Sequence, residues 1–373
     1  MVVILLVMLI GMVSFAIDVG YVAAARTEMQ DTADSGAHAG LSKLYASFSP
    51  TPNYTNAKAE VNRFVGGSAG NVPGLAVADA DIQFGYFDPA GVVGSRFTTT
   101  LGNNQPNAVR VTLRKDGTTN PKLALFFAPV LGKADNAVQA RATAWVPPGL
   151  GVLANAELIP YAAQVDYFYA AAGMTPRASN SSGFVSVSTG SFSDNWAIGA
   201  PNTMPTPGHD GVKELVLFGS TQTAPGNFGS LDLGTSSNGT PELARQLRYG
   251  PNASDFNIMK TAGKLAADGS LQSPVAMTGD TGISNGTKDD WAAIVGQNKI
   301  IPLYDTVGGN GNNASYHIVG FAGVRIVAVD MTGNPKQVWV QPTQFYSSKV
   351  TASLSGSGQS MIGVHAPPKL VIP

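Results

Sequence analysis

The residue with the most unusual chemical placement is Asp18. It follows the apolar run of residues 1–17, interrupted only by Gly11 and Ser14, and more apolar residues come after it. A carboxylate in a membrane-length helix is costly unless it is paired or reaches the interface. Two interpretations are open. Asp18 lies hydrated at the outer headgroup level, or it lies inside a helix bundle, paired with Ser14 or with an amine or the Tyr21 hydroxyl of a neighbouring chain.

Other side chains that could support catalysis are few and scattered. Cysteine is absent, which excludes disulfides, thiolate metal ligands and cysteine nucleophiles. The GxSxG spacing occurs at "GGSAG" (66–70), which follows a predicted helix, and at "GISNG" (282–286), which follows no predicted strand, so no nucleophile elbow is predicted. There is also no P-loop or strand-anchored GxGxxG pattern, and no HExxH or HxH pair among the histidines. These histidines are His38, His209, His317 and His365. We expect His317, in "YHIVGF", to be a core strand residue. We also expect that the protein is not an enzyme and has no catalytic residue and no cofactor.

Two features resemble ligand sites but have simpler explanations. "GGNGNN" (308–313) lies between two predicted strands, so it is expected to be a long hairpin loop rather than a phosphate cradle. Oxygen ligands that calcium could use occur on or near glycine-rich loops: Asp79, Asp81, Asp232, Asp280, Asp305 and Asn310. Because EF-hand spacing is missing and loop aspartates usually form Asx turns or caps, no metal site is predicted.

The composition is that of a folded, nearly neutral chain. Of 373 residues, 44% are hydrophobic and only 13% are charged, and the net charge is −1. No basic block is present, which argues against a nucleic-acid partner. The 43 glycines and 24 prolines favour short strands and many turns after the opening segment.

The opening segment predicts one long helix. Residues 1–25 carry a single charge, Asp18, and would span about 37 Å as a helix, enough to cross a bilayer core of about 30 Å. The pattern continues without proline to Pro50, so we expect a helix from about residue 2 to about 46, about 67 Å long. Its second half must then stand outside the membrane.

The charge distribution around this helix leaves two topologies open. The first basic residue is Arg26, on the far side of the apolar run, whereas basic residues usually mark the cytoplasmic side. Either the bulk of the chain is cytoplasmic, or a short basic leader precedes Met1 before processing. We favour the leader, because the glycine-rich remainder is typical of extracytoplasmic proteins.

Small residues recur at helical spacing along this segment. Such faces allow helix backbones to approach closely, although incidental small residues on an ordinary anchor are an equal alternative. With Ser14 and Asp18 they form the predicted helix–helix assembly set: Ser14, Ala16, Asp18, Gly20, Ala24, Gly36 and Gly40.

The next hundred residues predict a compact α+β unit. "NYTNAKAEVNRFVGG" is expected to form a helix with Ala57, Val61, Phe64 and Val65 on one side. Strands are predicted in residues 75–87, 107–117 and 136–146. In the second, Val109, Val111 and Leu113 face one way. The apolar run "KLALFFAPVLGK" (122–133) is expected to be a buried helix or strand that ends at Pro129.

Proline and glycine at 147–149 mark the clearest domain boundary. The predicted organisation is an apolar helix (1–47), an α+β domain (48–147), a β-rich domain (148–354) and a glycine/serine linker with a tail (355–373). The tail either adds as a strand to a neighbouring chain or closes its own domain. The fold class is α+β.

The opening segment also resembles a known family. "FAIDVGYVAAARTEMQDTADSGAHAG" is similar to the amino terminus of the TadE/TadG-like proteins of bacterial tight-adherence (Flp) pilus systems. The matching positions are Asp18, Val19, Gly20, Arg26, Gln30, Ala33, Asp34, Ala37 and Gly40. Parts of the later sequence, such as "PGNFGSLDLG" and "MTGNPKQVWV", also resemble a carboxy-terminal domain of such proteins. A DxSxS adhesion motif found in other TadG-like proteins is missing.

The resemblance implies a structural subunit, a pilin or pseudopilin, of an extracellular type IV-like filament assembled through its helix. The expected partners are copies of the chain, the inner membrane and the pilus assembly machinery. The expected location is the cell surface or a filament, after anchoring in the cytoplasmic membrane. The alternative is a monomeric, membrane-anchored extracytoplasmic binding or adhesion protein.

Overall fold

A computed structural model describes most of the chain as two compact units. The described residues are 2–44, 52–68, 70, 72–102, 106–174, 192–197, 203–218, 229–234, 239–281, 283–309, 314–332, 336–353 and 361–371. Unit 1 consists of residues 1–46, 51–146 and 368–373, and unit 2 consists of residues 47–50 and 147–367. Unit 2 is therefore inserted between two segments of unit 1.

A single uninterrupted helix, α1 (Val2–Leu44), opens unit 1 and confirms the predicted long helix. The large apolar side chains described between Val2 and Val19 are exposed. From Ala25 onward, one face is buried in the core of unit 1 at three- and four-residue intervals: Ala25, Met29, Ala33, Ala37, Leu41 and Leu44. The two halves of α1 thus differ in what they contact, although both are helical.

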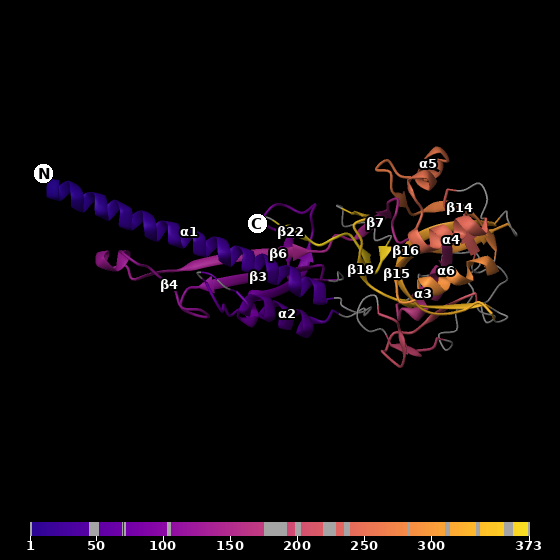
Figure 1. Cartoon of the computed structure of the whole chain (residues 1–373), viewed down its shortest axis with the longest axis horizontal. Coiled ribbons are helices and arrows are strands. Elements are labelled where there is room, and N and C mark those ends of the chain that lie inside the picture. The colour runs from indigo at the N-terminus through magenta and orange to yellow at the C-terminus, as the bar shows by residue number, and fades with distance from the viewer. Residues whose placement is uncertain are drawn as a thin grey trace. The chain divides into compact units, whose positions relative to one another are not determined.

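The body of unit 1 is an antiparallel sheet covered on one face by helices. Its strand order is β2 (Phe97–Thr98), β1 (Ile82–Phe87), β3 (Ala108–Lys115), β6 (Val138–Trp145) and β22 (Lys369–Val371). The core between sheet and helices includes Val109, Val111 and Leu113, as predicted. Figure 1 shows the first half of α1 projecting beyond this sheet.

The second helix, α2 (Tyr54–Gly66), packs beside α1. Asn53 caps it by accepting a hydrogen bond from Asn56 N–H at 2.9 Å. Val61 and Val65 are buried as predicted. Phe64 was predicted to lie on the same side, but it is exposed, and the Arg63 guanidinium carbon lies 4.4 Å from the centre of its ring.

The carboxy-terminal tail pairs within its own chain. Strand β22 lies antiparallel to β6, with Lys369 opposite Trp145 and Val371 opposite Thr143. This pairing corresponds to the second alternative for the tail, in which the tail completes a domain of its own chain. That domain is unit 1.

The apolar run 122–133 is not a buried helix or strand, so that prediction was wrong. It forms a hairpin in which β4 (Leu123–Ala124) pairs with β5 (Asp135–Asn136), and a short 3₁₀ helix, η2 (Ala128–Leu131), lies between them. Pro129 starts this helix instead of ending one. Of the run's large side chains only Leu123 is buried, because the others lie beside the exposed half of α1 and not in the core.

Unit 2 is β-rich. Its sheet runs β11-β17-β16-β14-β12-β8-β15, and β15 also pairs with β16, so five of these strands close into a ring. The bounds are β7 (Gly149–Val152), β8 (Tyr161–Gln164), α3 (Val165–Ala171), β9 (Trp196–Ala197), β10 (Thr206–Pro207), β11 (Leu215–Leu217), β12 (Gly229–Leu231), α4 (Thr240–Tyr249), α5 (Ala253–Thr261), β13 (Leu271–Gln272), β14 (Val275–Thr281), α6 (Lys288–Ala293), β15 (Asn298–Gly308), β16 (Ala314–Asp330), β17 (Gln337–Pro342), β18 (Phe345–Tyr346), β19 (Val350–Ala352), β20 (Met361–Ile362) and β21 (Val364–His365). A short 3₁₀ turn, η3 (Asn285–Thr287), also occurs in unit 2, and another, η1 (Asp79–Asp81), occurs in unit 1.

The β15–β16 hairpin tests two of the predictions. Gly308 lies opposite Ser315 in antiparallel register, which confirms a hairpin at "GGNGNN", although residues 310–313 lie outside the described residues. His317 was expected in the core but lies on the outer face, where Nδ1 is 2.8 Å from Asp305 Oδ1. Its strand neighbours Tyr316 and Ile318 take the inward positions, because successive side chains alternate between faces.

A buried lysine makes the stability of unit 2 depend on pH. Lys299 is 3% exposed, its ammonium donates to the Arg248 carbonyl at 3.0 Å, and burial lowers its pKa from 10.5 to about 8. The unfolded chain therefore binds more protons than the folded chain between these values, and stability rises with pH across that window. Below about pH 8 the full cost of the buried charge remains.

Replacing Lys299 with methionine should therefore stabilise unit 2 near neutral pH, by about 2 kcal/mol after the lost hydrogen bond is allowed for. Urea unfolding of the full chain should show a gain that shrinks as the pH approaches the lysine's unfolded pKa. An equal gain at neutral and alkaline pH would show that packing, and not charge burial, causes it.

Candidate functional site

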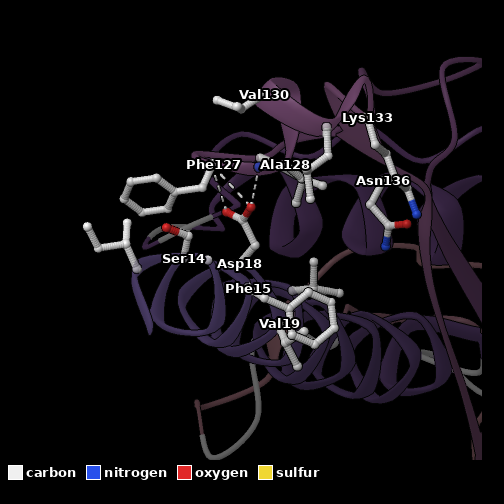
Figure 2. Close-up of a pocket in the computed structure, with 14 residues that line it drawn as sticks. Ser14, Phe15, Asp18, Val19, Phe127, Ala128, Val130, Lys133 and Asn136 are labelled. Carbon is white, nitrogen blue, oxygen red and sulfur yellow. Dashed lines mark hydrogen bonds between the residues drawn. The ribbon is translucent and has the colours of Figure 1, made fainter. Parts of the chain in front are cut away.

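Asp18 is held by three consecutive backbone N–H groups of the hairpin tip. Phe126 N–H donates to Oδ1 at 2.8 Å, Phe127 N–H lies 3.1 Å from Oδ2 and 3.3 Å from Oδ1, and Ala128 N–H donates to Oδ2 at 2.6 Å. Figure 2 shows the carboxylate directed at this backbone. The side chain is 5% exposed although it lies on the projecting half of α1. We call this arrangement the Asp18 clamp.

The loop's own sequence explains how three N–H groups converge. Pro129 fixes φ near the start of η2, and Gly132 takes φ of 84°, a left-handed conformation that suits glycine. The N–H groups of Val130 and Gly132 donate to the carbonyls of Phe127 and Pro129 at 3.1 and 3.0 Å. The turn is thus closed by its own backbone, and the preceding N–H groups remain available to Asp18.

Aromatic and aliphatic contacts extend the clamp along α1. The rings of Tyr21 and Phe126 lie 4.8 Å apart. A groove of about 640 Å³ separates α1 from residues 126–131, which we call the apolar tip. Its lining comes from both elements: Ile10, Gly11, Ser14, Phe15, Asp18, Val19, Val22, Leu125, Phe127, Ala128, Val130, Leu131, Lys133 and Asn136. Several of these side chains are labelled in Figure 2.

The first part of the predicted assembly set divides between the groove and the opposite surface of α1. Ser14 is half-buried and lines the groove with Asp18. Ala16, Gly20 and Ala24 are exposed and take no part in the groove lining. Around Gly20 no atom of the described residues lies within 4 Å of where a Cβ would lie. The part of the chain that the structure describes therefore leaves this small-residue face uncovered at Gly20.

The second part of the set, Gly36 and Gly40, is used within unit 1. A Cβ at Gly36 would lie 3.1 Å from Val65 Cγ2, and one at Gly40 would lie 2.5 Å from Val61 Cγ2 and 3.3 Å from Val109 Cγ1. The two glycines let α1 approach α2 and the sheet closely. Within the chain both glycines thus serve the packing of α1, and a contact between chains at these positions stays a prediction.

Other residues of the opening motif also act inside unit 1. Ala33 and Ala37 are fully buried in its core. Gln30 Nε2 donates to Asp34 Oδ1 at 2.9 Å and to the Arg141 carbonyl on β6 at 3.0 Å. These residues of the motif thus hold α1 on the sheet of unit 1.

Neither interpretation of Asp18 from the sequence anticipated a partner in residues 126–128. Both sought that partner in solvent, on the same helix or in another chain. A usable signal was present in "FFAPVLG", an apolar stretch that contains both a proline and a glycine. Such a stretch is more typical of a turn than of a core helix or strand.

No metal site is formed by the described residues. Within them no group of three or more His, Asp or Glu side chains is placed to hold a metal ion. Three of the carboxylates that calcium could have used, Asp79, Asp81 and Asp305, pair with Lys58, Arg114 and His317, respectively. Asn310 lies outside the described residues.

The comparison with known families concerns the segment that forms α1. Residues 1–46 match the Tad family, described as putative Flp pilus-assembly TadE/G-like. The amino-terminal segment is TadE/G-like. The match confirms the resemblance of this segment and does not extend to the rest of the chain. No curated protein and no solved structure matches the chain.

The family match and the helix together indicate a coarse function. Helix α1 is long and apolar enough to cross a membrane by length and composition, and only 6% of its most apolar window is buried. The TadE/G-like segment suggests involvement in Tad pilus assembly. A membrane-anchored, surface-related protein associated with pilus machinery fits both findings.

Proposed function

We propose that this chain is a structural subunit, a pilin or pseudopilin, of an extracellular type IV-like Tad pilus filament. In this proposal the subunit is anchored in the cytoplasmic membrane and then assembles with copies of itself through α1. The observation that carries the proposal is the exposed apolar half of α1, which includes every large hydrophobic side chain described between Val2 and Val19.

An apolar surface of this kind requires a nonaqueous environment. Contiguous exposed apolar surface on this scale marks a membrane or a protein interface. A bilayer provides that environment before assembly, and the helices of neighbouring subunits provide it within a filament. The two environments succeed each other in the life of a pilin-type subunit.

The exposed face formed by Ala16, Gly20 and Ala24 supplies a contact surface between subunits. Small residues at four-residue spacing allow two helix backbones to approach closely, and van der Waals packing then favours association in an apolar environment. Because this face lies outside the groove, a neighbouring helix could occupy it without displacing the apolar tip.

The Asp18 clamp makes the charge compatible with both environments. The carboxylate oxygens accept hydrogen bonds within the chain, so Asp18 requires neither water nor a partner subunit. The apolar half of α1 can therefore move from lipid to a filament core with its charge already paired.

Electron microscopy of material sheared from cells tests the proposal, with mass spectrometry identifying the subunits. We expect regular filaments that contain this chain. If the chain is found only in membranes, as single copies, the proposal fails and a monomeric anchored binding or adhesion protein remains.

A further inference from the structure

We propose that the apolar tip, residues 126–131, enters the bilayer beside α1, and that phospholipid acyl chains fill the groove between them. The chain would then enter the membrane with two segments that are far apart in the sequence, α1 and the apolar tip. This inference rests on the membrane anchoring in the proposed function and does not depend on filament formation.

The position of the tip along α1 supports this inference. The groove lining runs on α1 from Val22 past Asp18 to Ile10. Asp18 and Ile10 are eight residues apart, which is about 12 Å along a helix axis. Because Val130 and Leu131 line the same groove, the tip lies beside the apolar half of α1. A bilayer that surrounds this part of α1 must also accommodate the tip.

The tip's side chains suit a hydrocarbon environment. Val130 is 88% exposed and Leu131 is 84% exposed, and the Phe126 ring is also largely exposed. None of residues 126–131 carries a charge. Lys133, which is exposed, follows the tip at the groove's rim and can extend its ammonium toward lipid phosphates.

The tip's backbone is also prepared for lipid, which offers no hydrogen bonds to polar groups. The N–H groups of Phe126, Phe127 and Ala128 donate to Asp18, and Pro129 has none. The N–H groups on either side donate to backbone carbonyls, at residues 125, 130, 132 and 133. The clamp therefore pairs the charged side chain with three N–H groups of the loop at once.

Lipid is a better occupant of the groove than a second copy of the chain. The exposed hydrophobic residues on α1 include Ile10, Met12, Val13, Phe15 and Ile17, which cover all sides of the helix. A helix that is apolar all round needs an apolar environment on every side, which a bilayer provides, whereas a single second copy of the chain would cover only one face. The groove is continuous with this all-round surface through Ile10 and Phe15.

Fluorescence quenching can test this placement, because the chain has no cysteine and a single introduced thiol is labelled uniquely. The full chain would be labelled at Leu131→Cys in the tip, Leu6→Cys on α1, or Val92→Cys in an exposed loop of unit 1 as the matched control. Each variant is reconstituted in phosphatidylethanolamine and phosphatidylglycerol vesicles. Quenchers are a nitroxide on the acyl chains and iodide in the water.

We expect the labels at Leu131→Cys and Leu6→Cys to be quenched several-fold more by the lipid nitroxide than the label at Val92→Cys, and to be shielded from iodide. The inference is overturned if the tip label is as accessible to iodide as Val92→Cys while Leu6→Cys is quenched from lipid. A tip label shielded from both quenchers also overturns it, since a second copy then covers the groove. If Leu6→Cys is not quenched from lipid, the anchoring itself fails.

Discussion

Replacing Asp18 with alanine is expected to release the apolar tip from α1. The change removes the acceptor of three N–H groups at distances of 2.6 to 3.3 Å, and no other acceptor for Phe126, Phe127 or Ala128 N–H is recorded among the described residues. In the wild-type chain the amides of residues 126–128 should be strongly protected from hydrogen exchange. In the variant their exchange rate should rise nearly to that of an open loop. The measurement is made on the full chain in detergent or nanodiscs.

Two variants sharpen this experiment. Asp18→Asn keeps the size and one carbonyl oxygen, so it should give intermediate protection, since an amide accepts weaker hydrogen bonds than a carboxylate. Asp31→Ala removes an exposed carboxylate from the same helix and should leave the tip amides unchanged. Unchanged protection in Asp18→Ala would show that the tip's own turn, and not the carboxylate, orders residues 126–128.

Replacing Gly40 with leucine is expected to destabilise unit 1 by about 3 kcal/mol or more. A Cβ alone at this position would lie 2.5 Å from Val61 Cγ2, and both Val61 and Val109 are fully buried. Valine in a helix has one strongly preferred rotamer, so Val61 cannot rotate away cheaply. The backbones of α1 and α2 must then separate.

Gly20→Leu is the matched control, because it makes the same change on the same helix at a position where no atom of the described residues lies within 4 Å of the Cβ site. It should leave unit 1 as stable as before or slightly more stable, since leucine is the better helix former. Urea-dependent hydrogen exchange in peptides of β3 can measure both variants. Equal effects at the two positions would contradict the assignment of Gly40 to intrachain packing.

Periodicity predicted the elements that bury a face. The single proline-free run predicted α1, and alternation at Val109, Val111 and Leu113 predicted β3 with the correct inward face. In both cases a repeating pattern over many residues corresponds to one contiguous contact surface.

Contacts between distant segments were not predictable in this way. The residues that bind Asp18 lie 108 to 110 positions later in the sequence. Strands β6 and β22, which pair with each other, are separated in the sequence by residues 147–367 of unit 2. The prediction for the run 122–133 was wrong because hydrophobic residues indicate an apolar environment but do not indicate whether it is a protein core or another apolar surface. Likewise, Gly36 and Gly40 have the spacing of a membrane interface but contact Val65 and Val61 of their own chain.

The central claim, that copies of the chain assemble through the exposed small-residue face of α1, is tested most directly by cross-linking at Gly20. With no native cysteine, Gly20→Cys places the only thiol of each copy on that face. Oxidation of intact cells, followed by electrophoresis of the sheared surface material, should give disulfide-linked dimers, which Val92→Cys should not. Recovery of Gly20→Cys solely as monomer, in material that still contains the chain, would contradict assembly through this face.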